Sequence, residues 1–192
     1  TSFYLVKALG IGIAPAFQVE TIPVGRVSPA SLAGRSVVIL NDTMLPPGLA
    51  GGALKAFVEQ GGGLLVVAAD KASWPENDDL LPAKLGAPVD RLSGRGGTIG
   101  YLDYSHPAFE VFKAPRSGDF SAARVLRYRT LEVAPTDRVL ARFDDGVGEA
   151  RHLVVTENND ICVITRRGPN PAAGQQGQLG GIYGLRGTTG DG

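Results

Sequence analysis

The stretch Ser36-Val-Val-Ile-Leu-Asn-Asp42 decides the expected fold, together with the later run Leu64-Leu-Val-Val-Ala-Ala69. Both runs are continuously apolar, which is typical of strands that are buried on both faces of a parallel sheet. Between them, residues 49–60 have the apolar spacing of a helix, and Gly61 can end that helix in the left-handed conformation. A strand, a helix and a strand in this order predict a right-handed βαβ unit. We therefore expect an α/β fold with a doubly wound, flavodoxin-like, mostly parallel sheet.

The chain after Val125 has a different character. Four short apolar stretches predict successive strands, at residues 125–133, 138–143, 152–156 and 161–165. Turn signals such as Asp145-Gly146 separate them, and Asp-Gly is a strong hairpin signal. We expect this strand-rich part to be antiparallel and to lie at the edge of the sheet.

The last segment is rich in glycine and has no sustained apolar periodicity. This composition is typical of chain that cannot bury enough apolar surface to order itself. The expected organisation is one α/β domain over residues 1–166 and a disordered tail over residues 167–192.

Composition excludes several kinds of function. The 192 residues carry 19 basic and 19 acidic side chains, so no net charge steers the chain to nucleic acid or to an anionic membrane surface. Cys162 is the only cysteine, so an internal disulfide and a multi-cysteine zinc site are both excluded. No run approaches the roughly 20 apolar residues that span a bilayer, which predicts a soluble chain. We expect no metal, no cofactor and no nucleic-acid partner.

Polar residues follow both predicted parallel strands. In open α/β sheets, ligands bind outside the carboxyl ends of the strands, so Asn41, Asp42 and Asp70 are the candidate pocket residues. The same residue types are ordinary turn formers, because their side chains bond to nearby backbone. A structural role as turn formers is therefore the favoured interpretation, and a pocket is the alternative.

His106 is the fourth candidate, since an imidazole near a carboxylate can act as a general base. No serine or cysteine lies in a Gly-x-Ser-x-Gly elbow that would supply a nucleophile.

Cys162 lies within an apolar run, where cysteine behaves as a small hydrophobic residue. Arg124, Arg127 and Arg129 could suggest a nucleic-acid face, but the neutral total favours a solvated strand face.

Several runs together resemble one family, the glutamine amidotransferase-like domain of bacterial membrane proteins that have an aerotolerance-type N-terminal region and a von Willebrand factor A domain. The resemblance covers roughly residues 1–150. The runs that carry it are residues 36–42, 56–60, 61–67, 100–107, 118–124 and 138–146.

The resemblance implies a class I amidotransferase fold without the activity. In active members, a sharp elbow after the strand carries a cysteine nucleophile. Here the corresponding strand ends in Ala68-Ala69-Asp70, and alanine offers no nucleophile. The family also implies a parent anchored in the inner membrane only through parts outside this chain, with this domain periplasmic and other protein domains as partners. The sequence departs from the family pattern after about His152.

Three hypotheses follow. The first is a non-catalytic interaction or ligand-sensing domain, a pseudoenzyme that retains a fold without its reacting group. The second is a hydrolase with a site at the strand ends, built from Asp42, Asp70 and His106. The third is a structural spacer. Convergence of the three side chains on a pocket would favour the hydrolase.

Overall fold

The computed structural model describes most of the chain up to Asp144 and three later strands. The residues described are 2–13, 17–75, 80, 83–110, 112–114, 120, 123–133, 138–144, 151–155, 161–165 and 181–187.

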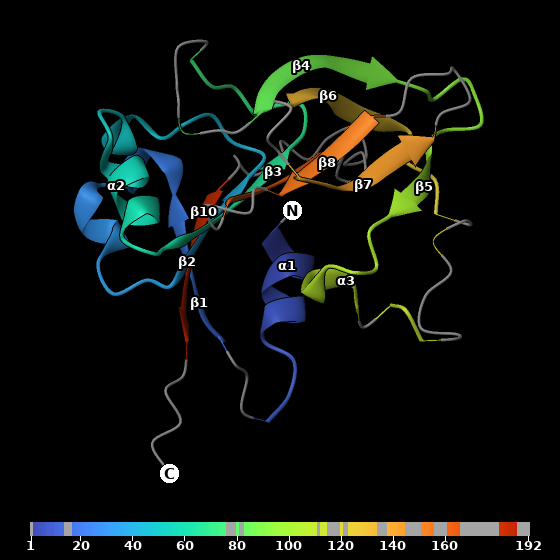
Figure 1. The fold of residues 1–192 in the computed structure, drawn as a ribbon. Helices are drawn as coiled ribbons and strands as arrows, with labels where there is room; N and C mark the ends of the chain where they lie inside the picture. The colour runs from blue at the N-terminus through green and yellow to red at the C-terminus, as the bar shows by residue number, and fades with distance from the viewer. Residues whose placement is uncertain are drawn as a thin grey trace.

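Eight strands form one mixed sheet in the order β1-β10-β2-β3-β9-β8-β7-β5 (Figure 1). A second sheet contains only β4 and β6. The strands are β1 (Phe17–Pro23), β2 (Val37–Asn41), β3 (Gly63–Ala68), β4 (Ala83–Asp90), β5 (Thr98–Leu102), β6 (Arg127–Val133), β7 (Arg138–Asp144), β8 (Arg151–Val155), β9 (Ile161–Thr165) and β10 (Gly181–Gly187). The helices are α1 (Ser2–Leu9), α2 (Ala53–Glu59) and α3 (Pro107–Glu110), with 3-10 turns η1 (Val24–Arg26), η2 (Pro29–Leu32) and η3 (Pro47–Leu49).

The predicted strand-helix-strand unit is present. β2 and β3 pair in parallel, with Val38 opposite Leu64, and α2 connects them. The helix ends where Gly61 adopts a φ of 91°. Gly62 then donates its N–H to the Phe57 carbonyl at 3.0 Å, which is the bonding of a glycine-stopped helix.

The expectation of a doubly wound, flavodoxin-like sheet of the class I glutamine amidotransferase type is wrong. Of the seven pairings in the main sheet over the described residues, β2–β3 and β3–β9 are parallel and the other five are antiparallel. Within the described residues the helices are few and short, and α2 directly connects the neighbouring parallel strands β2 and β3. The physical reason is that a continuous apolar run marks a strand with two covered faces, but it does not specify the direction of the neighbouring strands. The expected antiparallel pairing of the later strands is confirmed by β7–β8 and β8–β9.

The tail predicted over residues 167–192 contains one described strand. Within residues 167–192, β10 lies between β1 and β2 and is antiparallel to both. Its sequence Gly181-Ile-Tyr-Gly-Leu-Arg-Gly187 has too many glycines to read as a strand. Neighbours on both sides nevertheless supply partners for its backbone groups, and this pairing compensates for the poor propensity. The rest of the predicted tail lies outside the described residues.

The central strands bury side chains on both faces. One face carries the larger apolar cluster, in which Leu40 and Leu64 contact Leu54 and Val58 of α2. The other face carries Ile39 and Val67, against which α1 packs. Figure 1 shows α1 and α2 on opposite sides of the central strands.

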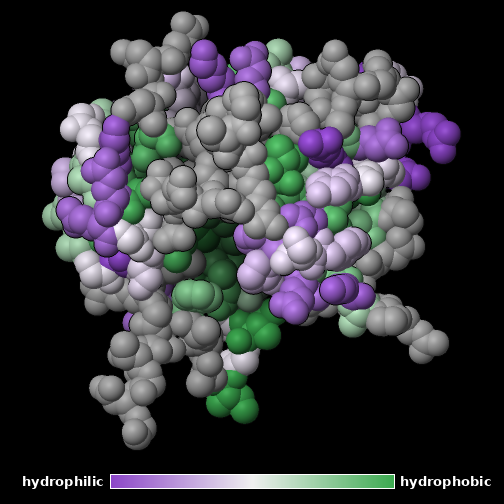
Figure 2. All heavy atoms as spheres, in the orientation of Figure 1, coloured by the Kyte–Doolittle hydropathy of each residue, from purple (hydrophilic) through white to green (hydrophobic). Residues whose placement is uncertain are grey.

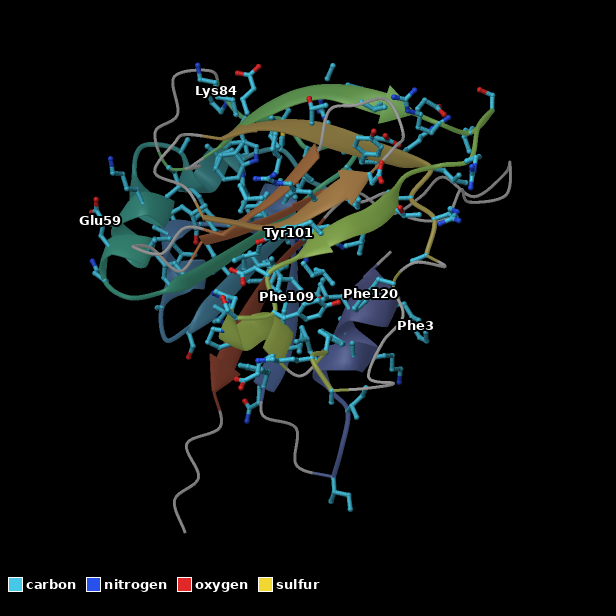
Figure 3. The ribbon with its side chains drawn as sticks, turned by 45° about the vertical axis from the view of Figure 1, so that its right-hand side comes forward. Phe3, Glu59, Lys84, Tyr101, Phe109 and Phe120 are labelled. Carbon is cyan, nitrogen blue, oxygen red and sulfur yellow. The ribbon has the colours of Figure 1, made fainter. Side chains whose placement is uncertain are left out.

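Apolar side chains gather low on the face shown in Figure 2, where α1 and the residues after it lie. Ile11 and Ile13 are 77% and 106% exposed there. Figures 1 and 3 both show α3 beside α1, and Figure 3 labels Phe109 and Phe120 in this region. Phe112 links these two aromatic rings, with centroids 6.4 Å from Phe109 and 5.1 Å from Phe120.

Across the described part of the chain, no helix has the length and apolar character needed to cross a bilayer.

Candidate functional site

Three of the four predicted site residues lie together at the carboxyl ends of β2 and β3. Because these strands are parallel, Asn41 and Asp42 end beside Asp70 and Lys71. The Asp42 N–H donates to the Val67 carbonyl at 2.7 Å, so the pairing continues one residue beyond β2. The sequence therefore located this edge correctly.

The Asp42 side chain holds a turn. Its φ is 51°, in the left-handed region, where Asp is one of the few residues tolerated other than Gly. Asp42 Oδ1 accepts the Lys71 N–H at 2.8 Å and so links the two chain segments that leave the parallel strands. Asn41 is 8% exposed, and Asp70 is exposed. Asp42 thus has the turn-forming role that was the alternative interpretation.

Arg129 of β6 closes the turn that follows β3. Its guanidinium donates to three backbone carbonyls: Nε to Ala69 at 3.2 Å, Nη1 to Gly86 at 3.0 Å and Nη2 to Ala72 at 2.6 Å. Hydrogen bonds from a charged donor are about twice as strong as neutral ones. Arg129 therefore fixes the turn at residues 69–72 that follows β3.

This turn contains no cysteine. Ala68 and Ala69 are 0% and 5% exposed. The expectation that Arg129 belongs to a solvated strand face is wrong, because its side chain is partly buried and bonded to backbone. Arg127 does have a surface ion pair, with Nε 2.5 Å from Asp90 Oδ2.

His106 is not near the other three candidates. β3 and β9 are parallel, and β8, β7 and β5 each reverse direction, so β5 runs opposite to β3. His106 follows β5 and therefore lies at the edge where β3 begins, four strand spacings away in the sheet order. At about 4.8 Å per strand, the lateral separation alone is about 19 Å.

The backbone of His106 starts α3. Its N–H donates to the Asp103 carbonyl at 3.2 Å, and its own carbonyl accepts N–H groups from Phe109 and Glu110 at 2.9 and 3.0 Å. Asp103 Oδ1 also accepts the Ser105 N–H at 3.0 Å. His106 is thus part of a turn that ends β5 and begins a short helix.

No group of three or more His, Cys, Asp or Glu residues that could hold a metal ion occurs within the described residues. Cys162 lies in β9, where its backbone is in register with Leu65 and Val155. The structure describes the backbone of Cys162 and not its side chain.

A second site was not expected from the sequence. An open hollow of about 470 Å³ lies between η2 and α2. Figure 3 labels Glu59 on the same helix, pointing outward. The lining is mostly small or apolar: Pro29, Leu32, Ala33, Gly34, Arg35, Ala53, Ala56, Phe57, Gln60, Gly61 and Gly62.

The helix sequence explains the hollow. Ala53, Ala56, Phe57 and Gln60 follow the i, i+3, i+4, i+7 spacing of one helix face, while the buried Leu54 lies on another. The two alanines leave space that larger side chains would fill. This second stripe was the signal that could have identified the site.

Phe57 and Arg35 are both held in place at the hollow. A Cβ added at Gly62 would lie 2.3 Å from Phe57 Cζ, so only glycine admits the ring in this position. The Arg35 guanidinium is paired with Glu20, and its Nε donates to the Ser31 carbonyl at 3.5 Å. The hollow therefore combines an ordered aromatic wall with a positioned cation.

Comparison of the chain with models of known families, with curated proteins and with solved structures found no match.

Proposed function

We propose that this chain is a non-catalytic interaction domain that binds another protein through the hollow between η2 and α2. The main observation that supports this proposal is the turn after β3, which side-chain hydrogen bonds hold in place. The side chains of Arg129 and Asp42 form hydrogen bonds with backbone groups there. The edge of the sheet at the carboxyl ends of β2 and β3 therefore has a structural role. The hollow, in contrast, is lined by side chains that leave space open.

The hydrolase alternative uses Asp42, Asp70 or His106 as acid, base or metal ligand, and His106 can act together with the two aspartates only if all three reach the same bond. General acid and base groups must lie within hydrogen-bond reach of the same reacting atoms. The lateral distance of about 19 Å between β5 and β3, estimated from strand spacing, is far beyond that reach. No observation therefore favours the hydrolase over the interaction domain.

The cellular setting belongs to the same proposal. The resemblance of residues 36–42, 56–60 and 61–67 to a domain of bacterial membrane proteins supports a parent anchored in the inner membrane, with this domain on the periplasmic side. Partners would then be other domains of the parent or of its complex.

Photo-crosslinking in cells tests the proposal. A benzophenone amino acid placed at position 56, in the lining of the hollow, should give one defined adduct with another protein. The matched control is the same residue at position 84, because Lys84 is exposed on β4 and lies outside the hollow. Figure 3 labels Lys84 on the opposite side of the molecule from α3.

Two results would contradict the proposal. One is an identical adduct pattern from positions 56 and 84, which would indicate random collision. The other is turnover of ester, amide or phosphate substrates by the purified chain that is lost in both Asp42→Asn and Asp70→Asn variants. Such a loss would return the strand ends to a catalytic role.

A further inference from the structure

We propose that the hollow between η2 and α2 binds the carboxyl-terminal residue of a partner polypeptide. The apolar side chain of that residue would lie against Phe57 and Leu32, and its free carboxylate would bind Arg35. This inference rests on the proposed interaction role and adds the chemistry of the partner.

The apolar part of the hollow has the size of a small ligand site. Its volume of about 470 Å³ falls within the range of about 300–1,000 Å³ that is typical of such sites. Ala53 and Ala56 form one wall, and the Phe57 ring, fixed above Gly62, forms another. Binding sites of this kind are mostly apolar with a few polar groups that orient the ligand.

Arg35 supplies the polar group. Its side chain is only 12% exposed, and it already binds one carboxylate, that of Glu20, through Nη2. Glu20 itself is 55% exposed and stands on the edge strand β1. Because a guanidinium can hold a carboxylate through two parallel N–H bonds, an incoming carboxylate can take the place of this exposed partner.

A carboxyl-terminal residue fits these features better than an internal acidic residue. It carries an apolar side chain and a carboxylate on the same Cα, so both groups enter together. In an internal Asp or Glu, the carboxylate is the side chain itself, and the apolar wall of Phe57 would remain uncovered. Gln60, which also lines the hollow, can bond to the peptide backbone that leads away.

A pair of short peptides tests the inference. N-acetyl-Gly-Gly-Phe with a free carboxylate and the same peptide with a carboxamide end are titrated into the isotopically labelled chain, and shifts of the α2 amide signals give each Kd. The amide should bind at least tenfold more weakly, since a bond to a charged group is worth about 1.5–3 kcal/mol.

Two variants should change the affinity for the acid peptide in opposite directions. Arg35→Gln should remove the preference for the acid over the amide. Glu20→Gln should raise the affinity for the acid several-fold, because it removes the competing carboxylate while leaving Arg35 in place. A general loss of structure cannot produce opposite effects. Ala56→Trp, which fills the hollow, should abolish binding of both peptides.

Three outcomes would overturn the inference: equal binding of acid and amide, no binding of either, or binding of free 3-phenylpropanoate as tight as that of the peptide. The last would assign the hollow to a small organic acid. If the adduct from position 56 persists while no peptide binds, the interaction role stands and only the carboxylate chemistry fails. If the adduct is also absent, both proposals fail.

Discussion

The two faces of the central strands are made from alternate residues of the same apolar runs, yet they are covered to different extents. On the face under α2, Val38, Leu40, Leu64 and Val66 are all between 0% and 1% exposed. On the face under α1, Ile39 and Val67 are 1% and 7% exposed, and their neighbours Val37 and Leu65 are only half-buried.

The difference follows from what covers each face. The first face lies under α2, and the buried cluster also contains Val27, Leu32 of η2, Leu49 of η3 and Leu131 of β6. The second is covered by α1, an eight-residue helix, and by residues of β1. A continuous apolar run therefore identifies a strand with two apolar faces, and the covering elements decide how much each face stabilises the fold.

Adjacent leucines of β3 test this difference most directly. Leu64→Ala should lower the free energy of unfolding by about 3 kcal/mol, because it leaves a cavity in the fully covered face. Leu65→Ala should lower it by about 1–1.5 kcal/mol, because the half-buried side chain loses less apolar contact. Urea denaturation of the two variants measures both values. Equal losses would show that the two faces are equally important.

Arg129 extends the comparison to the edge of the better-covered face. Arg129→Gln should destabilise the chain by about 2 kcal/mol, since three backbone carbonyls lose a charged donor in a partly buried position. Arg127→Gln, two residues away on the same strand, is the control. Its ion pair joins a half-buried guanidinium to the exposed Asp90 carboxylate and should contribute about 0–1 kcal/mol. The prediction fails if denaturation midpoints of the two variants coincide.

Asp42 gives the smallest expected effect. Asp42→Asn should change the free energy of unfolding by less than about 0.5 kcal/mol, because Asn also tolerates a positive φ and can accept the Lys71 N–H. Asp42→Ala should cost about 1–1.5 kcal/mol through the lost acceptor and the strained backbone. A large loss in the Asn variant would instead show that the negative charge itself is needed, which thermal unfolding of both variants can reveal.

The parts of the fold that could be predicted are local ones. The β2-α2-β3 unit follows from two apolar runs, one helical period and a glycine that stops the helix, all within residues 36–69. The polar edge at Asn41, Asp42 and Asp70 follows from where those runs end. The position of β10 between β1 and β2 could not be predicted, since it depends on pairings between segments that are distant in the sequence.

The functional residues that were missed share one cause. Arg129 reads as a surface arginine until β6 is placed over the turn after β3, and the hollow exists only because η2 lies beside α2. The separation of His106 from Asp42 likewise depends on three strand reversals between them. Apart from the second stripe of α2, which lines the hollow, these arrangements have no signal in local composition or spacing.

The position of β10 limits the order in which the strands of this sheet can pair during folding. Phe17 is in register with Gly187, and Asn41 is in register with Gly181, so the first two strands of the chain are joined only through its last described strand. Such pairings give a high contact order, and the closure entropy of these long loops must be overcome before the strand contributes. We expect β2, α2 and β3 to form early and β1 to dock late, so that refolding is slow compared with helical proteins of similar length.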